Sequence, residues 1–181
     1  KVTIPEGYRL KLFGEQESRE ESNDALIGQL PAALILIFMV LLLLFGNLRD
    51  PLVVLITVPL IFVGVVLGLG VTGKMFDFFS LLGLLGLVGM NIKNAVILIA
   101  RIRELRADDY EPINAVVEAT ADRFIPVVAA SLTTILGMIP LLADSMFGSM
   151  AATIMGGLLV ATLMVLVVLP VVYSLFYRIK L

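Results

Sequence analysis

The chain has no cysteine and no histidine, and only 15% of its 181 residues are charged. Without cysteine it has no disulfide framework, no thiolate zinc site and no cysteine nucleophile. Without histidine it lacks the commonest general base, the commonest metal ligand and every Ser-His-Asp arrangement. The net charge is −2 and no basic tract is present, so nucleic acid is not an expected partner. We therefore expect no enzyme, no cofactor and no bound metal.

What the chain does contain is mostly apolar. Hydrophobic residues make up 60% of it, against roughly 45–50% in soluble domains, and the mean hydropathy is +1.06. A helix needs roughly 20 apolar residues to cross a bilayer, and the alternating segments of a β-barrel are absent. The sequence therefore predicts an all-α transmembrane helical bundle. Its five membrane-spanning helices are expected at about 30–48, 51–71, 78–102, 124–143 and 151–177.

The connections between these spans are short except for the polar segment 103–123, in which residues 111–122 are typical of an amphipathic helix at the membrane surface. Basic residues gather on one side of the expected membrane. The inner loops and the C-terminus hold Arg49, Arg101, Arg103, Arg106, Arg123, Arg178 and Lys180, whereas the outer hairpin loops hold Lys74. The positive-inside rule therefore predicts an external N-terminal segment and a cytoplasmic C-terminus.

Residues 1–29 differ from the rest. Residues 2–4 and 8–13 alternate like short β-strands around the turn Pro5-Glu6-Gly7, and residues 15–24 are acidic and compatible with a helix. Two strands are not a stable sheet alone, and no initiator Met or signal peptide precedes them. We therefore expect 1–29 to end an external domain, 30–181 to form the transmembrane domain, and the chain to be the C-terminal piece of a larger protein.

Lys93 is the most informative residue, because it lies near the middle of the span 78–102. A charge at that depth costs at least ~2.5 kcal/mol, and such residues usually pair with an opposite charge. None of the 15 acidic residues lies inside an apolar span. The pattern favours a functional lysine whose carboxylate partner is on another segment or subunit. A structural or snorkelling lysine is the alternative.

The neighbours of Lys93 favour a functional site. Asn91 and Asn94 add hydrogen-bonding amides to the same helix. Glycines at positions 83, 86 and 89 would let another helix approach closely, although plain close packing explains glycines equally well.

A second set of candidates lies in the span 124–143. Arg123 stands at its inner end, either as a functional cation or as an ordinary positive-inside anchor. Ser131 and Thr134 follow in the same helix, either as relay hydroxyls or as groups bonded to the preceding turn.

Several of these segments together resemble the resistance–nodulation–division (RND) efflux pumps. The run Gly89–Ile99 resembles the lysine-bearing tenth transmembrane helix of these pumps. Similar matches, in the same order, are Pro5–Tyr8, Arg123–Pro126, Ser131–Leu141 and Phe147–Gly157. The resemblance as a whole is closest to the drug-exporting branch, with the heavy-metal branch as the alternative.

The resemblance implies a trimeric proton antiporter of the bacterial inner membrane that works with a periplasmic adaptor and an outer-membrane channel. It implies twelve spans in two halves, with two aspartates on the fourth helix of the first half, which this chain lacks. By position Lys93 matches the lysine that pairs with these aspartates, Asn94 the residue after it, and Arg123 the arginine of the proton path. Ala130 stands where the family often has a threonine, which leaves a relay hydroxyl in doubt at that step.

The expected function is therefore part of a proton-driven exporter of drugs or other small amphiphiles. One alternative is a non-transporting membrane scaffold in which Lys93 docks an acid of a partner helix. Another is a protein-translocation accessory subunit of the same superfamily. A serine–lysine enzyme is disfavoured because Ser80, the nearest serine in sequence, is three to four helical turns from Lys93.

Overall fold

The computed structural model describes the backbone of residues 15–179 and the side chains of residues 28, 29 and 31–179. The strands predicted at 2–4 and 8–13 lie outside the described residues. The chain divides into two compact units, residues 1–38 and residues 39–181, and each is described by itself. The described part of the first unit belongs to one helix, α1, which contains Pro31 and ends in the second unit.

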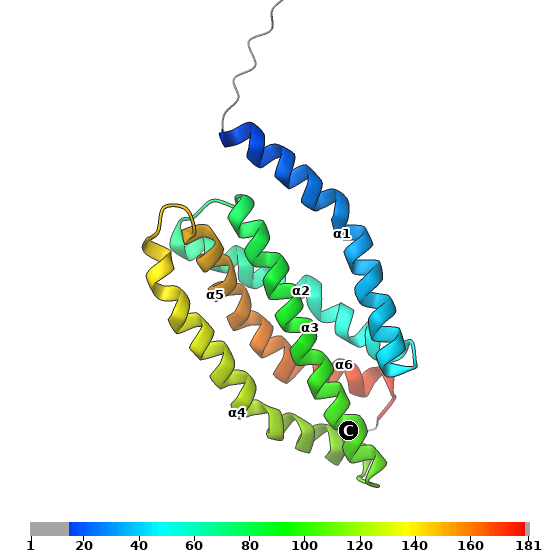
Figure 1. The fold of residues 1–181 in the computed structure, drawn as a ribbon. Helices are drawn as coiled ribbons and strands as arrows, with labels where there is room; N and C mark the ends of the chain where they lie inside the picture. Colours follow the sequence, from blue (N-terminus) through cyan, green and yellow to red (C-terminus); the bar gives the residue numbers. More distant parts are fainter. Residues whose placement is uncertain (1–14, 180–181) are drawn as a thin grey trace, which may run out of the picture. The chain divides into compact units, whose positions relative to one another are not determined.

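Helices form nearly all of the described chain (Figure 1). In order they are α1 (Glu15–Phe45), α2 (Arg49–Thr72), α3 (Phe78–Ala107), α4 (Pro112–Met138), the 3₁₀-helix η1 (Ile139–Ala143), α5 (Gly148–Leu163), the π-helix η2 (Met164–Val168) and α6 (Leu169–Phe176). Four stretches, Arg49–Thr72, Phe78–Ala107, Pro112–Ala143 and Gly148–Phe176, are long and apolar enough to cross a membrane. The apolar part of α1, Pro31–Phe45, is shorter. The predicted all-α transmembrane bundle is confirmed.

Two boundaries differ from those expected from the sequence. The helix predicted at 30–48 begins at Glu15, and it ends at Phe45 because Gly46 takes a left-handed conformation with φ of 65°. The surface helix predicted at 111–122 and the span at 124–143 are not separate, since α4 continues through Arg123. The sequence changes from polar to apolar at Arg123, but the helical backbone continues through this residue. Figure 1 shows α4 changing direction along its length, and Pro126 within it is the usual cause of such a bend.

The centre of the second unit is α5, which packs against α2, α3 and α4 (Figure 1). Glycines let α2 and α5 meet backbone to backbone. A Cβ atom added to Gly64 would lie 2.6 Å from the carbonyl oxygen of Gly156, and one added to Gly68 would overlap the carbonyl oxygen of Ala152. Small residues at a crossing are how membrane helices gain close van der Waals contact. The Gly64-x-x-x-Gly68 spacing is thus a helix-contact motif in this structure.

Side-chain hydrogen bonds hold the N-terminal end of α3 against α5. Asp77 accepts a hydrogen bond from the backbone N–H of Ser80 at 2.9 Å and another from the Ser149 hydroxyl at 2.6 Å. In the loop before α5, Asp144 accepts the backbone N–H groups of Phe147 and Met146 at 2.8 and 2.7 Å. These two hydrogen bonds lower the pKa of Asp144 below its ordinary value, so the turn keeps them fully above that value and loses them as the pH falls through the lowered pKa.

The last membrane helix contains a π-helical turn before its proline. Pro170 has no N–H to donate, and the backbone N–H of Leu169 bonds the Met164 carbonyl five residues earlier. The helix therefore continues from α5 into α6 without a free end inside the bundle.

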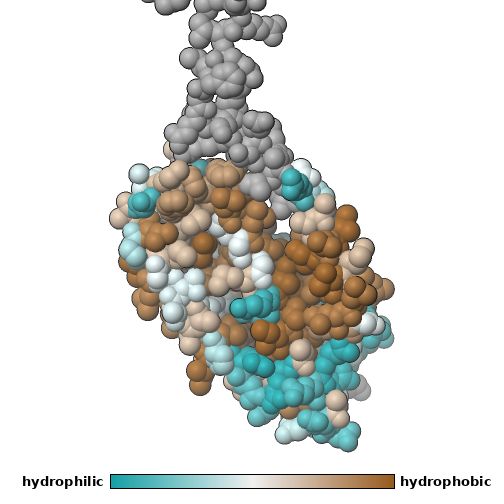
Figure 2. Space-filling view, in the orientation of Figure 1, coloured by the Kyte–Doolittle hydropathy of each residue, from teal (hydrophilic) through white to brown (hydrophobic). Residues whose placement is uncertain are grey.

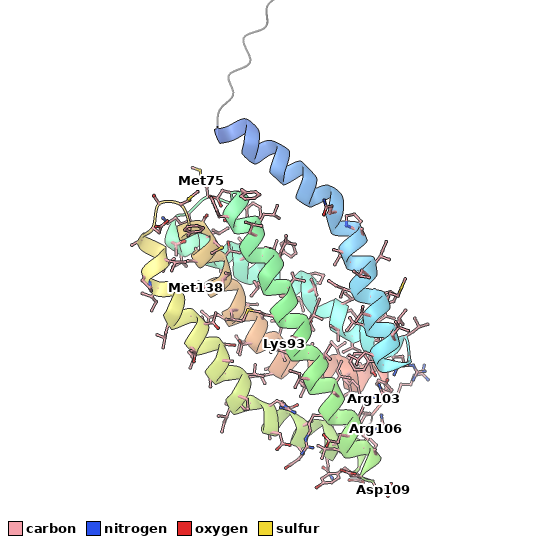
Figure 3. All side chains as sticks on the ribbon, viewed as in Figure 1. Met75, Lys93, Arg103, Arg106, Asp109 and Met138 are labelled. Carbon is pink, nitrogen blue, oxygen red and sulfur yellow. The ribbon has the colours of Figure 1, made fainter. Side chains whose placement is uncertain are left out.

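The surface of the bundle is divided by polarity. Figure 2 shows a broad hydrophobic face with hydrophilic residues gathered at one end, where Figure 3, in the same view, labels Arg103, Arg106 and Asp109. We call this the arginine-rich end and define it by Arg49, Arg103, Arg106 and Arg178. A hydrophobic face of this extent is what a bilayer requires.

We expect Gly68→Ala to destabilise the full-length protein by about 1–3 kcal/mol, because the new methyl group would separate α2 from α5. Gly70→Ala on the same helix is the matched control, since nothing lies within 4 Å of its Cβ position. Alanine there should be neutral or stabilising by up to about 1 kcal/mol. Thermal unfolding in detergent distinguishes the two, and equal melting temperatures would contradict the proposed crossing.

Candidate functional site

The α3 helix presents two chemically different faces at its middle. The Lys93 side chain is exposed, whereas Asn91, two residues earlier, is only 1% exposed. Residues two apart lie about 200° apart around a helix, so the two side chains point in nearly opposite directions. Figure 3 labels Lys93 midway along α3, and Figure 2 shows a small hydrophilic patch within the hydrophobic face near the same position.

Two of the three predicted packing glycines share the open face of Lys93. Gly86 and Gly89 are exposed, and nothing lies within 4 Å of either Cβ position. Gly83 instead packs on α5, where its Cβ would lie 3.1 Å from the Met150 carbonyl oxygen. We call Gly86, Gly89, Lys93 and Ile97 the open face of α3, because their three- and four-residue spacing places them on one side of the helix.

Lys93 has no charged partner within the part of the chain that the structure describes. No carboxylate among these residues lies within 4.0 Å of its ammonium group. Asn94 is half-buried beside it, and no hydrogen bond or ion pair among the described residues joins Lys93, Asn94 and Arg123 to one another. Two of the sequence-predicted relay residues, Lys93 and Asn94, therefore lie on α3 and the third, Arg123, on α4, with no hydrogen bond or ion pair between their side chains in the described structure.

Asn91 faces the core between α3 and α2. Its side-chain amide nitrogen donates to the Thr57 hydroxyl at 2.9 Å, and that hydroxyl donates to the Val54 carbonyl at 2.7 Å. The amide oxygen of Asn91 is buried with no hydrogen-bond partner among the described residues. Asn91 thus links two helices within this chain and does not share the face of Lys93.

Arg123 lies in α4 with its side chain half-buried. Its Nε atom is buried and has no hydrogen-bond partner in the described structure. The neighbouring carboxylate of Asp122 is taken by Arg101, whose guanidinium lies 2.8 Å away. A guanidinium with one enclosed, unsatisfied nitrogen differs from a fully hydrated membrane anchor.

The two candidate hydroxyl groups of α4 form different kinds of hydrogen bond, one between helices and one within α4. The Ser131 and Thr162 hydroxyls lie 2.6 Å apart and join α4 to α5. Thr134 donates to the carbonyl of Ala130 at 2.9 Å, which is a bond within its own helix. Ala130 itself is exposed. Ser131 is therefore placed at a helix contact, and Thr134 bonds the preceding turn.

The structure also reveals a buried carboxylate that the sequence analysis assigned to a loop. Asp50 is in the first turn of α2 and is 0% exposed. Its two oxygens accept hydrogen bonds from the Tyr177 hydroxyl at 2.8 Å and from the Asn47 amide at 2.9 Å. The Arg103 guanidinium lies 3.6 Å from the carboxylate and donates to the Phe45 carbonyl at 2.8 Å. No periodicity signals this cluster, because its members come from three separate stretches of the chain, at 45–50, 103 and 177.

Asp50 does not supply the missing partner of Lys93. Arg103, which contacts Asp50, is ten residues from Lys93 along α3, or about 15 Å at 1.5 Å per residue. The Asp50 cluster therefore ties the α1–α2 connection and the end of α6 to α3 at the arginine-rich end.

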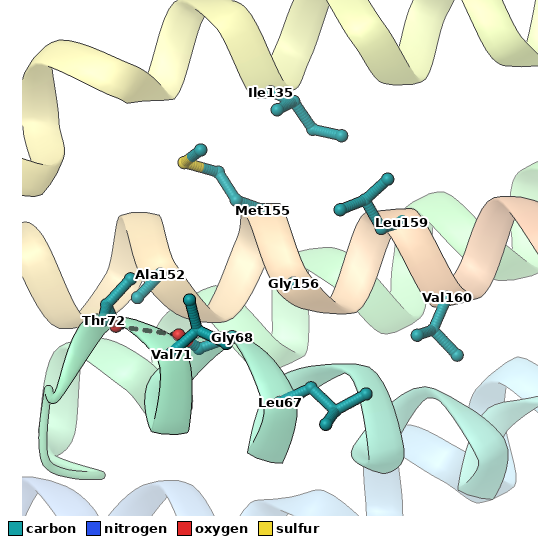
Figure 4. Close-up of a pocket in the computed structure, with 10 residues that line it drawn as sticks. All are labelled: Leu67, Gly68, Val71, Thr72, Ile135, Ala152, Met155, Gly156, Leu159 and Val160. Atoms are coloured by element: carbon teal, nitrogen blue, oxygen red, sulfur yellow. Dashed lines mark hydrogen bonds between the residues drawn. The ribbon is translucent and has the colours of Figure 1, made fainter.

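A cavity of about 270 Å³ lies between α2, α4 and α5 (Figure 4). Its lining is apolar except for Thr72, whose hydroxyl donates to the Gly68 carbonyl at 2.8 Å within its own helix. No charged side chain lines it, so it offers van der Waals contact and no group that could carry a proton.

Four helices long and apolar enough to cross a membrane, packed as a bundle, are the architecture of a multi-pass membrane protein. The model of the AcrB/AcrD/AcrF family matches residues 1–177. The chain belongs to this family of RND transporters.

Relatives named for different substrates match at similar identity. The cobalt-zinc-cadmium resistance protein CzcA of Cupriavidus metallidurans is 30% identical over 98% of this chain and 17% of its own length. The multidrug resistance protein MdtC of Klebsiella pneumoniae is 29% identical over 98% of this chain and 18% of its own length. A crystal structure of a heavy metal efflux pump has a TM-score of 0.78 and 32% identity, covering 91% of this chain and 17% of that one. The chain thus spans less than a fifth of the length of these relatives.

We expect Tyr177→Phe to loosen the end of α6, because it removes the hydroxyl that donates to buried Asp50. Leaving a buried acceptor short of a donor costs about 1–3 kcal/mol, which makes local opening about 5- to 150-fold more frequent. Hydrogen–deuterium exchange of the peptide 169–179 in the full-length protein measures this change. Tyr110→Phe, at an exposed tyrosine, should leave the rate unchanged. The Asp50 cluster would have no anchoring role if both variants exchanged at the wild-type rate.

Proposed function

We propose that this chain is the C-terminal membrane part of a proton-driven RND efflux transporter, a carrier rather than an enzyme. The observation that carries the proposal is Lys93, placed halfway along α3 on an open face beside Gly86 and Gly89, with no carboxylate in the described structure to meet it. A charge at this depth needs a partner, and the two glycines leave room for the helix that brings it.

The partner that we propose is the aspartate pair implied by the resemblance, on the fourth helix of the N-terminal half. An ammonium group beside two carboxylates favours their ionised form. Protonation of a carboxylate weakens the ion pair and frees the lysine, which gives an element with two arrangements that depend on proton occupancy. Lys93 would be the moving group of this switch, with Asn94 hydrogen bonding beside it.

Arg123 would serve the cytoplasmic side of the proton path. Its partly enclosed guanidinium supports this role, because a cation held beside a narrow water path changes the energy of a passing proton. Ser131 and Thr134 are used in contacts with α5 and with the preceding turn, which supports a packing role for these two hydroxyls.

The resemblance also supports the setting of the proposed pump. It would be a homotrimer of the bacterial inner membrane with a periplasmic adaptor and an outer-membrane channel. Its N-terminal segment would be periplasmic and its C-terminus cytoplasmic, in line with the basic residues of the arginine-rich end.

For the substrate we propose small amphiphilic molecules, because the resemblance as a whole is closest to the drug-exporting branch. Metal export is the competing candidate, favoured by the likeness to CzcA and to the heavy metal efflux pump. Cells carrying the full-length protein should export an amphiphilic dye without gaining tolerance to cobalt, zinc or cadmium. The reverse result would assign the protein to metal export.

Lys93→Met tests the proton switch. We expect the full-length variant to lose export almost completely while it keeps wild-type expression, trimer formation and melting temperature, because methionine fills the same space without the charge. Lys74→Met is the matched control in an outer loop and should export normally. Normal export by Lys93→Met would refute the switch. A scaffold role for the lysine would instead appear as failed assembly.

Arg123→Ala tests the cytoplasmic proton path. We expect export to fall and its dependence on pH to shift, because the cation that shapes the path is gone. Arg49→Ala, at the first residue of α2, should keep the wild-type pH profile. If Arg123→Ala transports at the wild-type rate across a pH series, Arg123 is a membrane anchor.

A further inference from the structure

A continuous groove runs between α4 and α6 at the arginine-rich end. It consists of three cavities in series, of about 330, 200 and 380 Å³. The first and second share Ile113 and Ile179, and the second and third share Val116, Val117 and Pro170. We call this series the α4–α6 groove.

Beyond its first cavity the α4–α6 groove is apolar. It has two hydroxyl groups, and both are bonded to their own helix: Thr120 donates to the Val116 carbonyl at 2.7 Å and Ser174 to the Pro170 carbonyl at 2.9 Å. Its walls are open to the surroundings, since Val117 is 60% exposed and Leu175 is 69% exposed. This part of the groove therefore suits a hydrocarbon chain and offers nothing to a polar ligand.

The first cavity is charged. Arg106 and Arg178 line it together with Glu111, whose carboxylate accepts a hydrogen bond from the Asn114 amide at 3.1 Å. No carboxylate of the described residues lies within 4.0 Å of either guanidinium. The first cavity thus has two positive side chains and one negative side chain in its lining, which leaves a net positive charge at this end of the groove.

Arg178 follows the end of α6 in a left-handed conformation, with a φ of 50°. The backbone N–H groups of Arg178 and Ile179 donate to the carbonyls of Leu175 and Ser174 at 3.2 and 2.9 Å, which is a common way for a helix to end. The turn that ends α6 therefore places Arg178 in the lining of the first cavity.

We propose that the α4–α6 groove binds one anionic phospholipid, with the phosphate between Arg106 and Arg178 and an acyl chain along Val116, Val117 and Pro170. The two guanidinium groups match a negatively charged headgroup, and the apolar walls match its chain. This site is separate from the open face of α3.

Photo-cross-linking of the full-length protein in lipid nanodiscs tests the site directly. The probe is phosphatidylglycerol with a diazirine on one acyl chain, compared with phosphatidylethanolamine that carries the same chain. We expect the phosphatidylglycerol probe to label peptides 113–124 and 170–179, and the phosphatidylethanolamine probe to label them several times less. Equal labelling by both probes would overturn the proposal, as would a transmembrane peptide that co-purifies and cross-links in the groove.

Variants separate the headgroup from the chain. Arg106→Gln and Arg178→Gln should each weaken phosphatidylglycerol binding by about fivefold, and about 25-fold together, measured by native mass spectrometry. Arg101→Gln is the charge-matched control, because its guanidinium already pairs with Glu104 and Asp122, and it should change binding less than twofold.

Filling the groove gives a second test that leaves the charges unchanged. Val117→Trp should reduce labelling of peptides 113–124 and 170–179 at least tenfold, because the larger side chain occupies the path of the acyl chain. Leu163→Trp, at an exposed apolar position outside the groove, should leave the labelling unchanged. Loss of labelling in both variants, or in neither, would show that the chain does not lie in the α4–α6 groove.

Discussion

The close crossing of α2 and α5 at Gly64, Gly68 and Gly156 is the contact on which the rest of the bundle depends. In a bilayer no hydrophobic force drives helices together, so association needs close packing and hydrogen bonds between helices. Because α5 is held against α2 by its backbone, α3 and α4 pack on the remaining sides of α5. The hydrogen bond between Asn91 and Thr57 joins α3 to α2, and the one between Ser131 and Thr162 joins α4 to α5.

The same packing decides which residues of α3 remain open. The helix uses Asn91 and Gly83 to contact α2 and α5, so the side opposite Asn91 carries Gly86, Gly89 and Lys93 outward. An ammonium group halfway along a membrane helix is costly unless a carboxylate meets it. Among the described residues, the open face of α3 therefore carries a charge that no carboxylate meets. That unmet charge supports a role that depends on a second group of helices.

The arginine-rich end combines two uses of positive charge. Arg103 is held at the buried Asp50 carboxylate and at the end of α1, where it joins three parts of the chain. Arg106 and Arg178 have no carboxylate beside them in the described residues and stand at the mouth of the α4–α6 groove. The first use needs a fixed partner within the protein, and the second leaves charge for a ligand. Both lie where the positive-inside rule already places basic residues, so sequence counting alone does not distinguish them.

By itself the sequence determined the membrane class and the helical bundle, and it singled out Lys93 as a candidate, because long apolar runs and a single lysine within them are local features of the chain. It also carried the family resemblance that the comparison confirmed. It predicted a separate surface helix at 111–122, since polarity changes at Arg123, whereas α4 continues through that residue. Only the tertiary structure decided which of three neighbouring glycines packs, which way Asn91 points and that Asp50 is buried. These properties depend on residues far apart in the sequence, which periodicity cannot bring together.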